Sequence, residues 1–142
     1  MQINPSDVSP ELTKHFRGLR LWLPLQIHGI KPFIACFEEK LLLTTYFRNQ
    51  LVELGFKVGP EPDLTISYFW YPSKGINENT FNEKLVEFIH SNGDVFLSTT
   101  KIKGKFVIRM AILSIRTKKA TIDTAIAMLQ KCLTQAKEAF LI

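Results

Sequence analysis

The sequence predicts an α+β domain in which a small, mostly antiparallel four-stranded sheet is covered by helices on one face. Two long helical segments come first, and the spacing of apolar residues then changes from about 3.6 to 2 residues. Four strand-like segments follow in two pairs, with a helix between the pairs and another at the end of the chain. The predicted order is therefore α-α-β-β-α-β-β-α.

The first helix is predicted over residues 10–27. Ser9, Pro10 and Glu11 are typical of a helix start, because they supply a capping side chain, a first-turn proline and an acid. Pro24 should kink or end this helix. Its apolar residues point in several directions, so we expect contacts on more than one side and exposed apolar surface.

Three further helices are predicted from apolar residues at helical spacing, over residues 31–54, 78–91 and 121–139. In the second of these, Thr80 and Glu83 indicate a capping box. Strands are predicted over residues 56–59, 64–71, 95–102 and 105–113. Lys103-Gly104 separates the last two strands and is typical of a hairpin turn.

Length and composition indicate a single domain over residues 10–142, preceded by a polar lead-in over residues 1–9. The 142 residues carry a net charge of +5, but the basic residues are scattered. The densest basic cluster, at Lys101, Lys103 and Lys105, is interpreted as a solvated turn. The segment 103–107 faintly resembles the aromatic strand of RNA-recognition domains, yet its spacing is one residue short and an aromatic is missing. We therefore expect no nucleic-acid partner.

Other functional classes lack their signals. The apolar stretch over residues 19–34 is broken by charged residues and Pro24, so no membrane span is expected. With no signal peptide evident, the expectation is a soluble, cytoplasmic protein. Cys36 and Cys132 are predicted to be buried free thiols. The Glu38-Glu39 pair is interpreted as solvated charge.

No catalytic motif of the common kinds occurs, and no metal site is predicted. The three histidines are isolated in sequence, without a second ligand at metal spacing, and are expected at the surface or an interface: His15, His28 and His90.

Arg109 is the residue that the pattern itself singles out. It interrupts an apolar strand and shares a face with Val107, Ala111 and Leu113. An unpaired buried charge costs several kcal/mol, so the guanidinium must lie on a solvated face or meet an anion. The pattern alone favours an ion pair to a glutamate of a covering helix. The functional alternative is an anchor for a carboxylate or phosphate, which arginine holds bidentately.

Two segments resemble a known family. The first is Phe16-Arg17-Gly18-Leu19-Arg20-Leu21-Trp22, followed by His28-Gly29 and an apolar helix. The second is the strand over residues 105–112. Both are similar to the C-terminal small domain of the group II pyridoxal-phosphate (PLP) decarboxylases, and the aromatic-L-amino-acid branch is the most similar. The resemblance extends from about Ser9 to Phe140.

The resemblance implies the small domain of a fold type I, aminotransferase-like carboxy-lyase that decarboxylates an amino acid and acts as a homodimer. The catalytic residues and PLP would belong to a large domain that is absent here, so no catalytic residue is assigned in this chain and the fragment should be inactive alone. Arg109 and Thr13 are implied as substrate-binding residues. Arg17 is expected at the interface with the large domain, and the apolar Trp22 and Leu23 are expected to lie against that domain or to pair with another copy of the chain.

Thr13 occupies a position that is usually glycine in the aromatic enzymes, which leaves the substrate open. The alternative hypothesis is a stand-alone α+β module with a regulatory or ligand-binding role and no catalysis.

Overall fold

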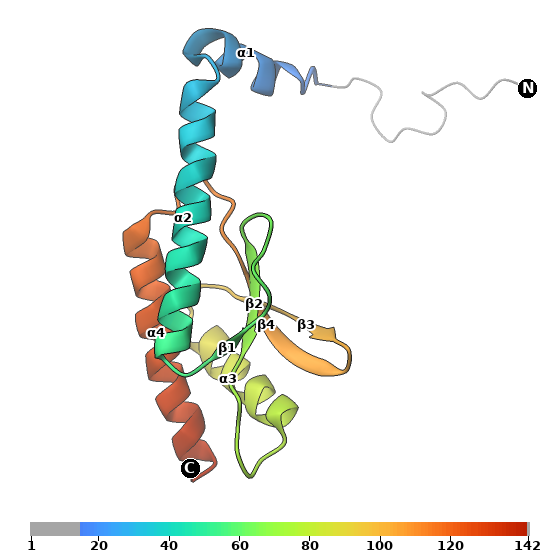
Figure 1. Ribbon diagram of the computed structural model, residues 1–142, viewed down its shortest axis with the longest axis vertical. Coiled ribbons are helices and arrows are strands. Elements are labelled where there is room, and N and C mark those ends of the chain that lie inside the picture. The colour runs from blue at the N-terminus through green and yellow to red at the C-terminus, as the bar shows by residue number, and fades with distance from the viewer. Residues whose placement is uncertain (1–14, 142) are drawn as a thin grey trace, which may run out of the picture. The chain divides into compact units, whose positions relative to one another are not determined.

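The computed structural model describes residues 15–141 (Figure 1). These residues form two compact units, the first ending at Ala35 and the second beginning at Cys36. Helix α2, Lys31–Glu53, crosses this boundary. The single domain expected over residues 10–142 stays a prediction.

The first unit contains helix α1, Leu19–His28. Residues 15–18 are not helical, so the helix predicted from residue 10 begins later within the described chain; residues 9–14 lie outside it. Pro24 does not end α1. The helix continues until the Gly29 amide bonds to the Leu25 carbonyl at 2.9 Å, where Gly29 takes a φ of 70° that favours glycine.

The second unit has the predicted order of elements. After α2 come β1 (Lys57–Val58), β2 (Ile66–Trp70), α3 (Glu78–Asn92), β3 (Ser98–Ile102), β4 (Lys105–Ala111) and α4 (Lys119–Ala139). The strands are shorter than the predicted segments, because the backbone pairing between neighbouring strands does not extend to the ends of those segments.

Local signals were only partly interpreted correctly. The Lys103-Gly104 hairpin is confirmed, with φ of 50° and 79° at the two turn residues. The capping box at Thr80 is wrong. Asn77 caps α3 instead, since its side-chain oxygen accepts from the amides of Asn79 and Thr80 at 2.9 and 3.3 Å.

The sheet has the order β1-β2-β4-β3, with every neighbouring pair antiparallel. Helices α2, α3 and α4 cover the inner face of the sheet, as Figure 1 shows. Phe69 of β2 is fully buried and meets Phe47 of α2 and Phe56 edge-on, at centroid distances of 5.6 and 5.5 Å. These contacts join the sheet to α2 through the centre of the core.

Within the second unit, no helix of the described residues covers the opposite face of the sheet. There the ring of Tyr68 lies against Gly59, whose amide donates to the Tyr68 carbonyl at 2.9 Å. A Cβ on Gly59 would lie 2.4 Å from the ring of Tyr68. Gly59 is therefore required for a close approach between the turn after β1 and strand β2.

We predict that Gly59→Ala displaces the Tyr68 ring and destabilises the protein by about 1–3 kcal/mol, because the added methyl overpacks the contact. Urea unfolding followed by circular dichroism measures the change. Gly18→Ala is the matched control, since a Cβ there would meet its nearest atom at an ordinary 3.7 Å. Equal midpoints for the two variants would contradict the prediction.

Candidate functional site

Arg109 lies on the open face of the sheet. In β4 its neighbours Ile108 and Met110 are buried toward the helices, so period-two alternation directs Arg109 the other way. The guanidinium is exposed, and its Nε donates to Ser98 Oγ at 3.1 Å. Of the two environments that the sequence allowed, the structure has the solvated face.

Arg109 makes no ion pair within residues 15–141, so the glutamate partner that the strand pattern favoured is wrong. Ser98 contacts it instead: the two residues are register partners on β3 and β4. The Ser98 hydroxyl also donates to the Arg109 carbonyl at 3.4 Å. The bond to Nε leaves the two outer guanidinium nitrogens available for an anion.

Aromatic side chains flank this arginine, and sequence reasoning did not identify them. Tyr68 is the register partner of Arg109 on β2. The ring of Trp70 stacks near that of Tyr68, with centroids 6.4 Å apart and planes 18° apart. The Lys105 ammonium lies 4.4 Å from the centre of the Trp70 ring. The alternation of β2 was the available signal, since residues 68 and 70 must share a face opposite Phe69.

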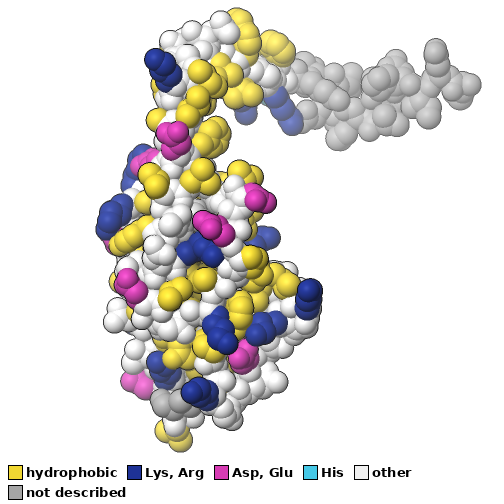
Figure 2. All heavy atoms as spheres, in the orientation of Figure 1, with side chains coloured by type: hydrophobic (Ala, Val, Ile, Leu, Met, Phe, Trp, Pro, Cys, Tyr) yellow, Lys and Arg dark blue, Asp and Glu magenta, His cyan; other side chains and the backbone are white. Residues whose placement is uncertain are grey.

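The basic turn beside this face is partly neutralised. Lys105 pairs with Glu78 at 3.1 Å, and Lys101 lies 3.8 Å from Glu83. Figure 2 shows basic side chains scattered among hydrophobic and acidic ones on the visible face. The two ion pairs agree with a solvated turn.

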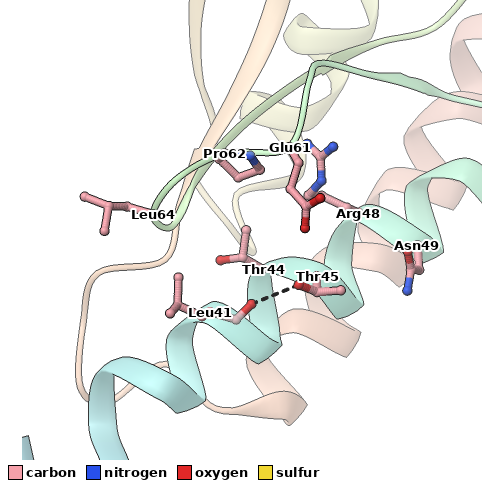
Figure 3. A pocket seen from close by; sticks show the side chains of 8 residues that line it. All are labelled: Leu41, Thr44, Thr45, Arg48, Asn49, Glu61, Pro62 and Leu64. Carbon is pink, nitrogen blue, oxygen red and sulfur yellow. Dashed lines mark hydrogen bonds between the residues drawn. The ribbon is translucent and has the colours of Figure 1, made fainter. Parts of the chain in front are cut away.

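A cavity of about 400 Å³ lies between α2 and the connection from β1 to β2 (Figure 3). Arg48 closes one side, where it donates to the Gly59 carbonyl at 2.8 Å. The wall combines hydroxyl, amide, guanidinium and carboxylate groups with apolar side chains: Leu41, Thr44, Thr45, Arg48, Asn49, Glu61, Pro62 and Leu64. Sequence reasoning did not predict this cavity.

The other predicted site residues belong to the first unit or to the undescribed end. Thr13 lies outside the described residues. Trp22 and Leu23 are 57% and 43% exposed, and no residue of α1 is buried. Arg17 is exposed just before this helix. The apolar surface that was expected on the first helix is therefore present.

The cysteines and histidines lie in different environments. Among the described residues, no cluster of potential metal ligands occurs and no helix is long and apolar enough to cross a membrane. Both cysteines are free: Cys132 is buried, which raises the pKa of its thiol, whereas Cys36 is only half-buried and that part of the prediction is wrong. All three histidines are exposed.

Glu39 and Lys40 correct the interpretation of the acidic pair on α2. Glu38 is exposed as expected, but Glu39 accepts from Lys118 at 2.7 Å and from Lys40 at 2.8 Å. The Lys40 side chain is only 2% exposed. Its ammonium also donates to the Thr117 carbonyl at 2.6 Å, so a buried cation joins α2 to the segment before α4.

We predict that Lys40→Met destabilises the protein by about 1–3 kcal/mol, because methionine fills the space but removes the donor to Glu39 and to the Thr117 carbonyl. Lys57→Met is the control, since Lys57 is exposed on β1. Urea unfolding of the three proteins measures the difference. A stability of Lys40→Met equal to that of the control would show that the buried ammonium contributes nothing.

The ion pairs of Glu39 also predict a pH dependence. Hydrogen bonds from Lys118 and then Lys40 hold the pKa of the Glu39 carboxyl below its ordinary value. A lowered folded-state pKa stabilises the protein above the unfolded-state pKa, and this stabilisation is lost as pH falls through the folded-state pKa. Between about pH 5 and 3, the wild-type protein should lose more stability than Glu39→Gln. Parallel pH profiles of the two unfolding free energies would contradict this assignment.

No family model matches the chain. Similar proteins include amino-acid decarboxylases and phenylacetaldehyde synthases. An aromatic-L-amino-acid decarboxylase from Bacillus atrophaeus is 30% identical in an alignment of 142 positions that covers 96% of this chain and 29% of that protein. Tryptophan decarboxylase 2 from Oryza sativa is 28% identical over 84% of this chain and 25% of its own length.

The chain resembles one part of the group II PLP decarboxylases. It spans less than a third of the length of the relatives it matches. The crystal structure of Oryza sativa TDC with PLP and tryptamine has a TM-score of 0.78 at 18% identity, over 93% of this chain and 29% of that one. Catharanthus roseus tryptophan decarboxylase has a TM-score of 0.80 at 20% identity, over 86% and 27%. This chain thus has the fold of one part of these decarboxylases.

Proposed function

We propose that this chain is the C-terminal small domain of a PLP-dependent L-amino-acid decarboxylase. One observation carries the proposal. Sequence and fold both match decarboxylases over nearly the whole of this chain, but the match covers less than a third of the length of those enzymes. A domain of this kind would close the mouth of an active site whose catalytic residues lie elsewhere in the polypeptide. The longer enzyme would be a cytoplasmic homodimer.

PLP would be held by the absent part. The cofactor supplies the electron sink for decarboxylation and needs a lysine with which to form a Schiff base. Neither the cavity beside Arg48 nor the hollow lined by His90, Gly93, Val95 and Phe96 has a lysine in its wall. These two hollows therefore do not fit the cofactor, and we assign the described residues no step of its chemistry.

In this proposal Arg109 meets the carboxylate end of the substrate. The exposed outer nitrogens of its guanidinium, held by Ser98 through Nε, support that role. Decarboxylation disperses the carboxylate charge as the carbon–carbon bond breaks. A tight ion pair would stabilise the ground state more than the transition state, so Arg109 would orient the substrate or hold the mouth together.

The remaining assignments follow from the same proposal. Thr13 would lie near the substrate side chain. The exposed apolar side chains of Trp22 and Leu23, together with Arg17, would face the large domain. Exposed apolar patches of several hundred Å² usually mark such interfaces.

The alternative is a stand-alone α+β module that binds a ligand or regulates a partner. The polar-lined cavity beside Arg48 is the observation that favours it. The two functions differ in what Arg109 does, because a module without catalysis has no substrate carboxylate to orient.

We predict that Arg109→Lys lowers kcat/KM of the longer enzyme by about tenfold or more, equivalent to about 1.4 kcal/mol, since lysine keeps the charge and loses the fork. Steady-state decarboxylation assays measure the effect. Arg116→Lys is the matched control, because Arg116 is also an exposed arginine. Unchanged kinetics for Arg109→Lys would leave the arginine a structural role.

We further predict that the isolated chain binds PLP weakly or not at all. Titration with the cofactor should give no stable absorbance band in the Schiff-base region. A band that one lysine substitution abolishes would place the cofactor site in this chain and contradict the proposal.

A further inference from the structure

The segment that joins β4 to α4, residues 112–118, is fixed at both ends. The Ile112 amide donates to the Thr65 carbonyl at 3.1 Å, which continues the pairing of β2 with β4. Farther along, the buried Lys40 ammonium donates to the carbonyls of Thr117 at 2.6 Å and Ile115 at 3.4 Å. A connection between two elements is seldom tied to a buried cation.

A turn and an ion pair reinforce this segment. The Thr117 amide bonds to the Ser114 carbonyl at 3.1 Å, and the Arg116 amide bonds to Ser114 Oγ at 3.2 Å. Lys118 then donates to both carboxylate oxygens of Glu39, at 2.9 and 2.7 Å. The segment is thus tied to β2, to α2 and to itself at several points along its length.

This hydrogen-bonded segment displays apolar side chains. Leu113 and Ile115 are 70% and 66% exposed. Continuing the antiparallel register beyond Ile66 and Ala111 places Leu64 opposite Leu113.

Leu64 also lines the cavity with Leu41 of α2, and Phe37 lies one helical turn before Leu41. We call the exposed set the α2–loop patch: Phe37, Leu41, Leu64, Leu113 and Ile115.

The energetics point to a docking surface. Burying an ammonium is unfavourable unless its hydrogen bonds are complete. The Lys40 ammonium donates to carbonyls of the segment over residues 112–118, whose side chains Leu113 and Ile115 are exposed. Fixing a surface before binding lowers the entropy lost on association. The α2–loop patch is therefore preorganised for a partner.

We propose that the α2–loop patch docks against the large part of the decarboxylase that this chain lacks, with Lys40 holding the patch in its docking conformation. This inference rests on the proposed function. The chain covers 29% of the Bacillus atrophaeus relative, so most of such a polypeptide remains to cover exposed surface. The patch also continues along β2 and β4, past Ile66 and Ala111, into the open face that carries Arg109.

The test compares Ile115→Glu with the control Val52→Glu in the longer enzyme and in the isolated chain. Val52 is a 56% exposed apolar residue of α2 outside the patch. In the longer enzyme, Ile115→Glu should undock the domain, and amide hydrogen exchange over residues 112–117 should become about tenfold faster than in the control. In the isolated chain, where Ile115 is already exposed, the two variants should unfold at the same urea concentration.

Two results would overturn the inference. One is unchanged exchange over residues 112–117 in the longer Ile115→Glu enzyme. The other is a dimer of the isolated chain, seen by light scattering, that Ile115→Glu dissociates, because the occupant would then be a second copy. The two proposals fail separately: a longer protein without decarboxylase activity that still undocks contradicts only the function. An active enzyme insensitive to Ile115→Glu contradicts only the docking surface.

Discussion

The rest of the structure depends on the burial of one face of the sheet against the helices. Phe69 at the centre of that face is fully buried and meets Phe47 and Phe56 edge-on. Side chains alternate along a strand, so burying Ile108 and Met110 leaves Arg109 on the open face. The position of the candidate anchor is thus a consequence of core packing, and a one-residue slip of β4 would bury the guanidinium.

A second constraint acts at the edge of that core. The cation of Lys40 is satisfied by Glu39 and by carbonyls of the segment before α4, which fixes the exit of β4 relative to α2. The core and this buried cation together hold an open sheet face and an adjoining apolar surface in place. The side chains of Arg109, Leu113 and Ile115 are exposed in this chain, as expected for one side of an interface between domains.

Much of the fold follows from local sequence. The change of apolar period after residue 55 separated helices from strands, and Gly104 indicated the hairpin because glycine adopts a positive φ at no steric cost. The start of α1 and the cap of α3 were misplaced. At α3, Asn77 and Thr80 both carry capping side chains, and the sequence alone does not decide which one the backbone uses.

The site was less predictable, because its contacts join distant parts of the chain. Lys40 and Thr117 are 77 positions apart, so nothing in the neighbourhood of Lys40 indicates that it is buried. Arg109 was identifiable as a charge within an apolar strand, but its bond to Ser98 depends on strand register. The resemblance to the decarboxylases supplied what the pattern could not, namely that a larger part of the protein should face Arg109.

The central claim is that this chain is one domain of a longer enzyme. The most direct measurement is the intact mass of the polypeptide that the chain's own gene produces, with peptide mapping of any sequence that precedes residue 1. The account predicts a polypeptide far longer than 142 residues whose additional part carries the lysine that binds PLP. A folded, functional product of 142 residues with no covalently linked large domain would contradict it.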